Sequence, residues 1–172
     1  MKKFLLFLLP AIFFNNAAYA AESLAIGYVD LHKVLLESKV GKKNKAELDK
    51  LIKEKETAIG KEEEKLKAMQ QAFEKDQMLL TDVQKKTKQK EFQEKAEAYQ
   101  KMVNEAKQTV NQKDGEYAGK SIAEVKRIIT EMTKEQKLNI VFEASESGLL
   151  YADPSMDLTQ KVIERYDALS SK

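Results

Sequence analysis

The feature that most constrains this chain is a long stretch of helix-forming residues in its middle. From about Lys39 to Leu79 the sequence contains two glycines, Gly41 near its start and Gly60 in its middle, and no proline, and it is rich in Lys, Glu, Ala and Leu. These residues have high helix propensities, so the stretch predicts one long helix. Its apolar residues recur at intervals built from threes and fours, which places them on one face: Leu48, Ile52, Ile59, Leu66, Met69 and Phe73.

A second run has a more regular pattern. Its apolar residues follow a repeating four-three spacing that is broken only by Lys113; they are Phe92, Ala96, Tyr99, Val103, Ala106, Val110 and Tyr117. Because this spacing is sustained over several heptads, it predicts a coiled coil. In the first run, Lys55 and Glu62 stand where the repeat requires apolar residues. The seam of the first helix is therefore expected to be imperfect.

A signal for a new helix separates the two runs. Thr81 is followed three residues later by Gln84, which is the arrangement of a capping box. We therefore predict a chain reversal near Leu80 and Thr81, which makes the two runs an antiparallel hairpin. One continuous rod is the alternative. At about 1.5 Å per residue, roughly forty residues would form an arm about 60 Å long.

Short apolar segments flank the arm. The run 24–29 is almost continuously apolar, as in a strand buried on both faces, and Asp30 after it predicts the N-cap of a short helix. The returning helix is expected to continue to about Gln136. The runs 138–143 and 149–152 then predict two strands of a β-hairpin, because a Ser-Gly turn separates them.

A last amphipathic helix is predicted after Asp157, which is its expected cap. The body is therefore built from both ends of the chain, with the arm inserted between them. We predict an α+β, mainly α fold in which residues 21–38 and 122–172 form the body and residues 39–121 form the arm, with its tip near 79–82. Three short strands form a thin core with open edges, and open edges invite pairing with another chain. Oligomerisation is expected to complete this core.

The first twenty residues predict a cleaved signal peptide. Lys2 and Lys3 precede an apolar run, and Ala18-Tyr19-Ala20 supplies the small residues that signal peptidase requires. Cleavage near Ala20 would export the protein. The whole chain has 30 basic and 28 acidic residues, so loss of the two leader lysines leaves 28 of each. A mature chain of zero net charge does not indicate a nucleic-acid binder.

Few residues offer catalytic chemistry. His32 is the single histidine and the chain has no cysteine, so neither a metal site nor a cofactor is expected. The run Glu62-Glu63-Glu64 is interpreted as a solvated helix face, since successive helical residues point in different directions. No glycine-rich phosphate loop is present. The sequence predicts a binding protein and not an enzyme.

The two ends of the mature chain resemble those of the Skp/OmpH family of periplasmic chaperones. The similar residues occur in the family's order and are Ile26-Gly27-Tyr28-Val29-Asp30, then Ser38, Gly41 and Lys42, then Asn139-Ile140-Val141-Phe142, Tyr151-Ala152 and Asp157-Leu158-Thr159. The resemblance implies a periplasmic homotrimer whose helical arms project around a cavity. It also implies an ATP-independent holdase for unfolded outer-membrane proteins, without a cofactor, and weak contact with anionic lipid or lipopolysaccharide.

Candidate functional residues follow from both arguments. Apolar side chains outside the seam are candidates for client contact: Ala72, Met78, Leu79, Leu80, Ala98 and Met102. An electrostatic tip is predicted from Lys85, Lys86, Lys88 and Lys90, and Gly60 is the candidate hinge of the arm. The trimer body is predicted to share Leu24, Ile26, Tyr28, Leu138, Ile140, Phe142 and Leu150, together with Val162 and Ile163.

Two other classes of function fit parts of the pattern. A coiled-coil rod could act as a structural spacer in the cell envelope without touching clients. Its sequence would favour a continuous seam, whereas Lys55 and Glu62 interrupt this one. The lysines near the tip could instead bind nucleic acid or a membrane surface. Acidic residues among them, such as Asp82 and Glu91, dilute that patch.

Overall fold

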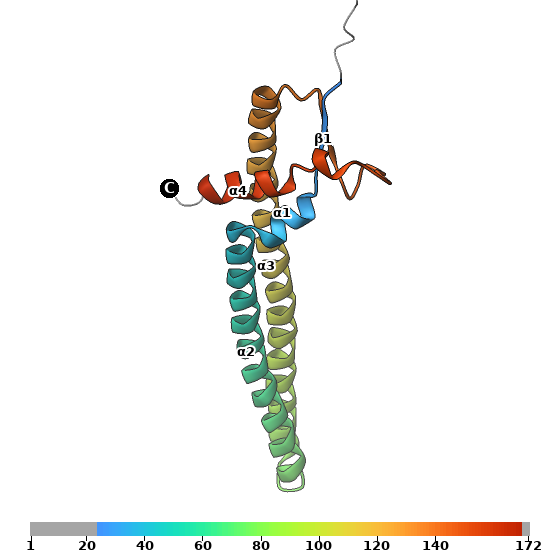
Figure 1. The fold of residues 1–172 in the computed structure, drawn as a ribbon. Coiled ribbons are helices and arrows are strands. Elements are labelled where there is room, and N and C mark those ends of the chain that lie inside the picture. The colour runs from blue at the N-terminus through green and yellow to red at the C-terminus, as the bar shows by residue number, and fades with distance from the viewer. Residues whose placement is uncertain (1–23, 170–172) are drawn as a thin grey trace, which may run out of the picture.

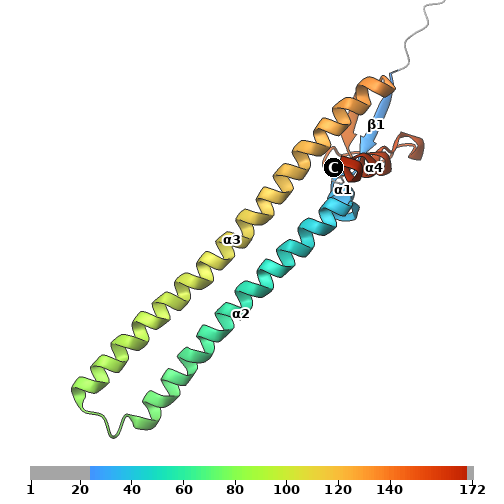
Figure 2. The ribbon, with the colours of Figure 1, turned by 90° about the vertical axis from the view of Figure 1, so that its left-hand side faces the viewer.

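A computed structural model describes residues 24–169, and the predicted signal peptide, residues 1–20, lies outside them. Two long helices run side by side as an arm, and the other elements gather at one end of it (Figure 1). Figure 2 shows the arm from the side, with its free end far from the small body. The predicted fold is confirmed: the chain is mostly helical, and a helical hairpin is inserted between two body segments.

The arm consists of α2 (Lys39–Asp76) and α3 (Asp82–Gln136). At about 1.5 Å per residue, the 38 residues of α2 extend about 57 Å and the 55 residues of α3 about 82 Å. The capping box is present, because Thr81 accepts a hydrogen bond from the backbone of Gln84 and the Gln84 side chain bonds back to Thr81. The new helix starts where these local bonds satisfy its first N–H groups, and the chain is not one continuous rod.

The seam between α2 and α3 is only half-buried. Its side chains are partly exposed at every predicted position of α2, and Lys55 and Glu62 occupy the seam together with their apolar neighbours. On α3, Ala106 is buried, with 6% of its surface exposed. Two helices alone cannot enclose a core, because both sides of their line of contact face solvent. The arm therefore keeps apolar surface accessible along its length.

The body contains a sheet of two parallel strands, β1 (Ile26–Val29) and β2 (Ile140–Glu143). The predicted hairpin between 138–143 and 149–152 is wrong, because 149–152 is not a strand and β2 pairs with β1. The physical reason for the different pairing is that all four residues of β2 can pair with the distant β1. The chain after β2 instead turns away at Glu146, whose N–H donates a hydrogen bond to the side chain of Glu143.

The outer edge of β1 is covered by the C-terminal part of the chain. The N–H of Leu158 donates to the carbonyl oxygen of Tyr28 at 2.9 Å, just after the 3-10 helix η1 (Pro154–Met156). No room is left for a third strand at this edge. The described sheet thus has two strands, and the outer edge of β2 is left as its open edge.

The core of the body lies where three helices meet the sheet. α4 (Thr159–Leu169) crosses α3 beside α1 (Leu31–Glu37) (Figure 1). The buried residues of this core are Val29, Val34, Val125, Ile128, Met132, Leu158, Val162, Ile163 and Tyr166. Val162 and Ile163 were predicted to need a neighbouring subunit. This prediction is wrong, because α4 buries both within its own chain.

A tight corner between α1 and α2 fixes the arm to the body. Ser38 is fully buried and its Oγ accepts a hydrogen bond from the N–H of Gly41 at 3.0 Å. Asp167 of α4 accepts a second one from the N–H of Lys39 at 2.8 Å. A Cβ on Gly41 would lie 1.7 Å from the carbonyl oxygen of Leu35, so only glycine fits this close approach.

Candidate functional site

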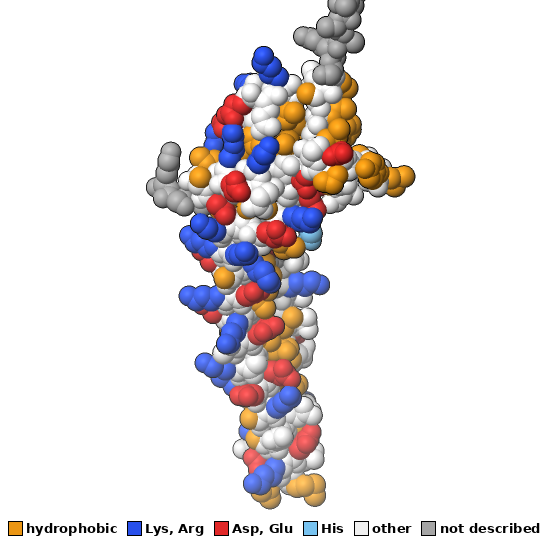
Figure 3. All heavy atoms as spheres, viewed as in Figure 1, with side chains coloured by type: hydrophobic (Ala, Val, Ile, Leu, Met, Phe, Trp, Pro, Cys, Tyr) orange, Lys and Arg blue, Asp and Glu red, His pale blue; other side chains and the backbone are white. Residues whose placement is uncertain are grey.

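The tip of the arm holds large apolar side chains in solvent. Met78 is 90% exposed, Leu79 is 85% exposed and Val83 is 74% exposed, whereas Leu80 is half-buried. Figure 3 shows hydrophobic side chains at the free end of the arm. The loop is held by local bonds, such as the one from the Leu79 N–H to the Asp76 carbonyl at 2.8 Å. These side chains are thus displayed by an ordered turn.

Positive charges lie next to this apolar tip. Of the predicted lysines, Lys86, Lys88 and Lys90 are exposed and Lys85 is half-buried. Lys90 lies 3.8 Å from Glu94, and the other three form no ion pair with any residue that the structure describes. An exposed lysine without a partner adds its full charge to the local field, which decays over about 8 Å at physiological ionic strength.

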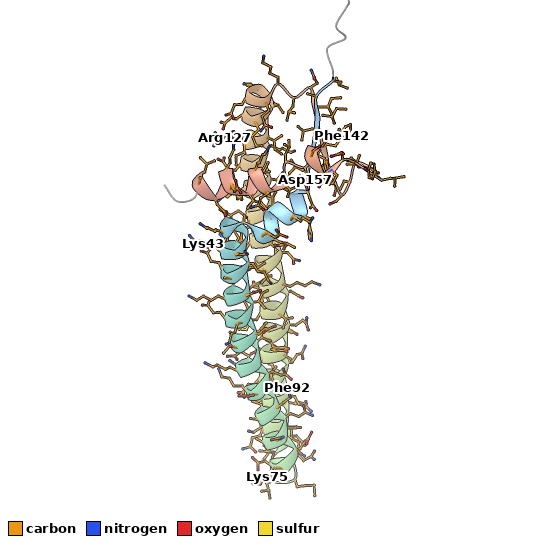
Figure 4. The ribbon with its side chains drawn as sticks, in the orientation of Figure 1. Lys43, Lys75, Phe92, Arg127, Phe142 and Asp157 are labelled. Atoms are coloured by element: carbon orange, nitrogen blue, oxygen red, sulfur yellow. The ribbon has the colours of Figure 1, made fainter. Side chains whose placement is uncertain are left out.

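A groove opens between the two helices just behind the tip. It has a volume of about 540 Å³ and is lined by Met69, Ala72 and Phe73 of α2 and by Phe92 of α3, with polar residues at its rim. Figure 4 shows Phe92 in the lower half of the arm. Phenylalanine is large, and in a two-helix hairpin no third helix covers it. The groove therefore presents aromatic surface to solvent.

The predicted client residues do not form one cluster. Ala72 lines the groove, and Met78, Leu79 and Leu80 lie at the tip beside it. Ala98 is exposed and Met102 is half-buried, and both lie further along α3 toward the body. The distal end of the arm therefore concentrates the accessible apolar residues, whereas its middle exposes them singly.

The two helices are tied together by side-chain hydrogen bonds at the base of the arm. Tyr117 of α3 donates to Glu47 of α2 at 2.5 Å, and Asn44 donates to Ser121 at 3.4 Å. The hydrogen bond to Glu47 and partial burial raise the pKa of Tyr117. Among the residues described, these are the side-chain bonds that join α2 to α3. Beyond the base, the apolar seam alone holds the arm together.

The charged surface of the arm carries many ion pairs, each formed between two residues of the same helix. Their ions are three or four residues apart, as in Lys67 with Glu63 at 2.7 Å. Lys120 and Lys113 hydrogen-bond to Glu116 and lower the pKa of its carboxyl group. Exposed pairs of this kind contribute little to stability, because solvent and salt screen them. They keep the arm soluble and do not create one dominant charged site (Figure 3).

Gly60, the predicted hinge, lies within α2. A Cβ at this position would meet nothing within 4 Å, so packing in the described chain does not require a glycine there. Glycine in a helix interior costs about 0.5–1 kcal/mol relative to alanine because it loses more backbone entropy. Gly60 thus lowers the local stability of the helix. Its role as a hinge stays a prediction.

The body presents an open apolar face. Because Ile26 pairs with Ile140 and Tyr28 with Phe142, these four side chains share one face of the sheet. Ile140 and Phe142 are each 39% exposed, Leu24 is 60% exposed and Leu150 is fully exposed, whereas Leu138 is half-buried against the core.

A cleft of about 370 Å³ lies on this open face. It is bordered by Ile26, Tyr28, Phe142, Tyr151 and Met156. Tyr151 is 82% exposed and Met156 is 40% exposed. So much exposed apolar surface in one place is typical of a surface that contacts another chain.

Several of these surface residues were not identified from the sequence. Val83 was not singled out, and Phe73 and Phe92 were assigned to the seam alone. Phe73 and Phe92 do lie between the two helices, as their heptad positions predict. A heptad pattern does not, however, predict the distance at which two large side chains keep the helices apart. Tyr151 was placed in a strand. Its aromatic ring beside Leu150 was the available signal of an exposed apolar segment.

The described residues offer neither a membrane-spanning helix nor a metal site. No helix within residues 24–169 is both long and apolar enough to cross a membrane. Over the same range, no three His, Cys, Asp or Glu side chains converge in a way that could hold a metal ion. The surfaces that the structure does offer are apolar and extended.

Comparisons with known proteins match most of the chain. The profile of the family described as outer membrane protein, OmpH-like, matches residues 25–166. A Skp-like protein of Chlamydia muridarum is 29% identical over 169 residues, which are 97% of this chain and 96% of that protein. An uncharacterized protein of Aquifex aeolicus is 29% identical over 145 residues, which are 84% of this chain and 87% of that protein.

A solved structure shows the same fold. The crystal structure of a chain described as an OmpH-like outer membrane chaperone, from Caulobacter crescentus, superposes with a TM-score of 0.78. The match covers 84% of this chain and 85% of the other, at 19% sequence identity. At this identity the likeness concerns the arrangement of the arm and body.

Proposed function

The chain belongs to the OmpH-like outer membrane protein family, and we propose that it is an ATP-independent holdase chaperone of the periplasm. It binds unfolded outer-membrane β-barrel proteins between its helical arms and prevents their aggregation before insertion. The observation that carries this proposal is the distal arm, where an aromatic groove adjoins exposed apolar residues at an ordered tip.

The chemistry of the arm suits clients without a fixed shape. Its accessible apolar side chains are spread over the groove, the tip and single exposed positions among charges, and they include the flexible methionines Met69 and Met78. Methionine adapts to irregular partners, so such a surface tolerates many sequences. Many weak contacts of this kind would hold an unfolded chain without requiring one defined pocket.

We further propose that the protein is a homotrimer held by its body. Several of the residues predicted for this role are exposed on the body, namely Leu24, Ile140, Phe142 and Leu150. Burying such surface contributes about 25 cal/mol per Å². The open edge of the sheet is also available, because the outer edge of β2 is unpaired in the described chain. Three bodies joined by these faces would bring three arms around one cavity.

The test of the holdase proposal uses the mature full-length protein. A denatured outer-membrane β-barrel protein is diluted into buffer with and without a stoichiometric amount of trimer, and light scattering follows its aggregation. We expect suppression without ATP. Unchanged aggregation at this ratio would refute the proposal, because a holdase acts by binding alone.

Charge should affect how fast clients are captured. We propose that Lys85, Lys86 and Lys88 attract acidic segments, since no ion pair within the described residues neutralises them. Their joint replacement by glutamate should slow capture at low salt and have little effect at high salt, because salt screens such attraction. Stopped-flow measurement of the association rate checks this, and an unchanged rate at low salt would exclude steering.

A structural spacer is the alternative function. A spacer gains from a stiff and continuous arm, whereas this arm has a half-buried seam containing Lys55 and Glu62 and an interior glycine that packing does not require. Within the residues that the structure describes, side-chain hydrogen bonds join the two helices only at the base of the arm. These features favour an arm that deforms around a client.

A further inference from the structure

The groove behind the tip differs in composition from the rest of the arm. Two phenyl rings, Phe73 of α2 and Phe92 of α3, face it together with the thioether of Met69. Aromatic rings prefer edge-to-face or offset contacts with other rings, which contribute about 0.5–1.5 kcal/mol beyond burial, and sulfur contacts with rings add about 0.3–1.5 kcal/mol. These three side chains form the floor of the groove, and the floor therefore favours binding of an aromatic side chain over an aliphatic one of similar size.

The rim of the groove suits an extended backbone. Gln77 and Gln89 border it, and their side-chain amides form no hydrogen bond with any residue that the structure describes, whereas the side-chain amide of Gln70 donates to Glu74 at 3.0 Å. A primary amide both donates and accepts, so it can pair with the N–H or C=O of any residue. Such pairing is independent of the client's sequence and satisfies backbone groups that an unfolded strand leaves open.

The charge of the rim is also nearly balanced. Lys88 lines the groove together with Glu74 and Glu91, so its charged residues carry a net charge of only −1. Strands of outer-membrane barrels alternate apolar and polar residues, and their outward faces carry girdles of aromatic residues at both membrane interfaces. An unfolded barrel strand thus presents uncharged aromatic side chains on an extended backbone, which complements both the floor and the rim.

We infer that this groove is a subsite for aromatic side chains of unfolded β-barrel strands. The ring inserts between Phe73 and Phe92, and the backbone on either side lies along Gln77 and Gln89. The inference rests on the proposed holdase function and specifies which client residues the arm selects. The exposed tip next to the groove then contacts the neighbouring apolar residues of the same strand.

The test compares two ten-residue strand peptides with alternating apolar and polar residues. One carries tryptophan at its apolar positions and the other carries leucine. The protein contains no tryptophan, so indole emission reports the first peptide alone, and competition reports the second. We expect the aromatic peptide to bind about tenfold more tightly, which corresponds to one or two ring contacts.

The matched variants are Ala72→Arg and Ala58→Arg in the full mature chain. Both alanines are exposed on α2 and lie fourteen residues apart, on nearly the same helix face and about 21 Å from each other. Only Ala72 lines the groove. Ala72→Arg should abolish the preference for the aromatic peptide, and Ala58→Arg should leave it intact.

Three outcomes would overturn the inference. The first is equal affinity of the wild type for both peptides, and the second is an unchanged preference in Ala72→Arg. The third is a change in oligomeric state on sedimentation of Ala72→Arg with unchanged peptide binding, which would make the groove an interface between copies. If the wild type suppresses client aggregation in any of these cases, the holdase function stands and only the aromatic subsite is refuted.

Discussion

Replacing Gly41 by alanine should destabilise the protein more than its position on a helix suggests. The new Cβ would lie 1.7 Å from the carbonyl oxygen of Leu35 and 2.6 Å from its carbonyl carbon. Both neighbours are backbone atoms at the end of α1, so no side chain can rotate away. The corner between α1 and α2 must open for the substitution to be accommodated.

The size of the effect follows from this geometry. Separating the Cβ and the oxygen to a distance of 3.0 Å, below which such contacts essentially never occur, requires a shift of about 1.3 Å from the present 1.7 Å. That shift strains the hydrogen bonds from Gly41 to Ser38 and from Lys39 to Asp167. Overpacking costs about 1–3 kcal/mol and loss of a cap about 1 kcal/mol, so we expect a loss of about 3 kcal/mol.

Equilibrium unfolding in urea would measure this loss, with all proteins at one concentration because an oligomer's stability depends on it. Gly60→Ala is the matched control, since its Cβ would meet nothing within 4 Å. The same chemical change should stabilise the protein there by about 0.5–1 kcal/mol. The two variants should therefore move the unfolding midpoint in opposite directions.

A neutral or stabilising Gly41→Ala would refute the reasoning. It would mean that the corner opens freely, and therefore that the backbone contact with Leu35 does not set the direction of the arm. Destabilisation by both variants would instead show that glycine is needed at Gly60 for a reason that packing in one chain does not reveal.

Three further predictions concern the arm, the body and pH. Gly60→Ala should reduce the capacity for large clients more than for small ones in the aggregation assay, because a stiffer α2 limits the cavity, and equal handling of both would count against the hinge. Ile140→Asp should leave the chain folded, since Ile140 is 39% exposed in one subunit, but should dissociate the trimer in light scattering; an intact trimer would contradict the proposed interface. Arg165 hydrogen-bonds to Glu135 and lowers its pKa below the ordinary 4.5, so this pair stabilises the fold above that pH and the contribution is lost as pH falls through the lowered pKa. Glu135→Gln should flatten the acid limb of stability against pH, and an unchanged limb in urea titrations would exclude this contribution.

Much of the arm could be predicted from the sequence because its determinants are local. Helix propensity, heptad spacing and the capping box of Thr81 and Gln84 act over a few residues each, and the structure contains the hairpin that they predict. The exposed apolar residues Met78 and Leu79 were also found this way. An apolar residue in a short turn has no neighbouring element that could bury it.

The sheet and the corner were decided by tertiary structure. The pairing of β1 with β2 joins segments more than a hundred residues apart, and it replaced the hairpin predicted from the nearby run 149–152. Likewise, the sequence showed Gly41 only as a residue in a resemblance, whereas the contact with Leu35 shows why glycine is required. Such features depend on which distant segments approach each other, and that is fixed by burial of the whole core.

The same distinction separates the two halves of the candidate site. Periodicity and chain reversal are encoded locally, so the apolar seam between α2 and α3 and the meeting of lysines with apolar residues at the tip could be predicted from the sequence. The groove between Phe73 and Phe92 was decided only in three dimensions. The groove opens because two large side chains from opposite helices lie at the same height along the seam. The positions of these residues in the sequence do not indicate the distance between the two helices at that height.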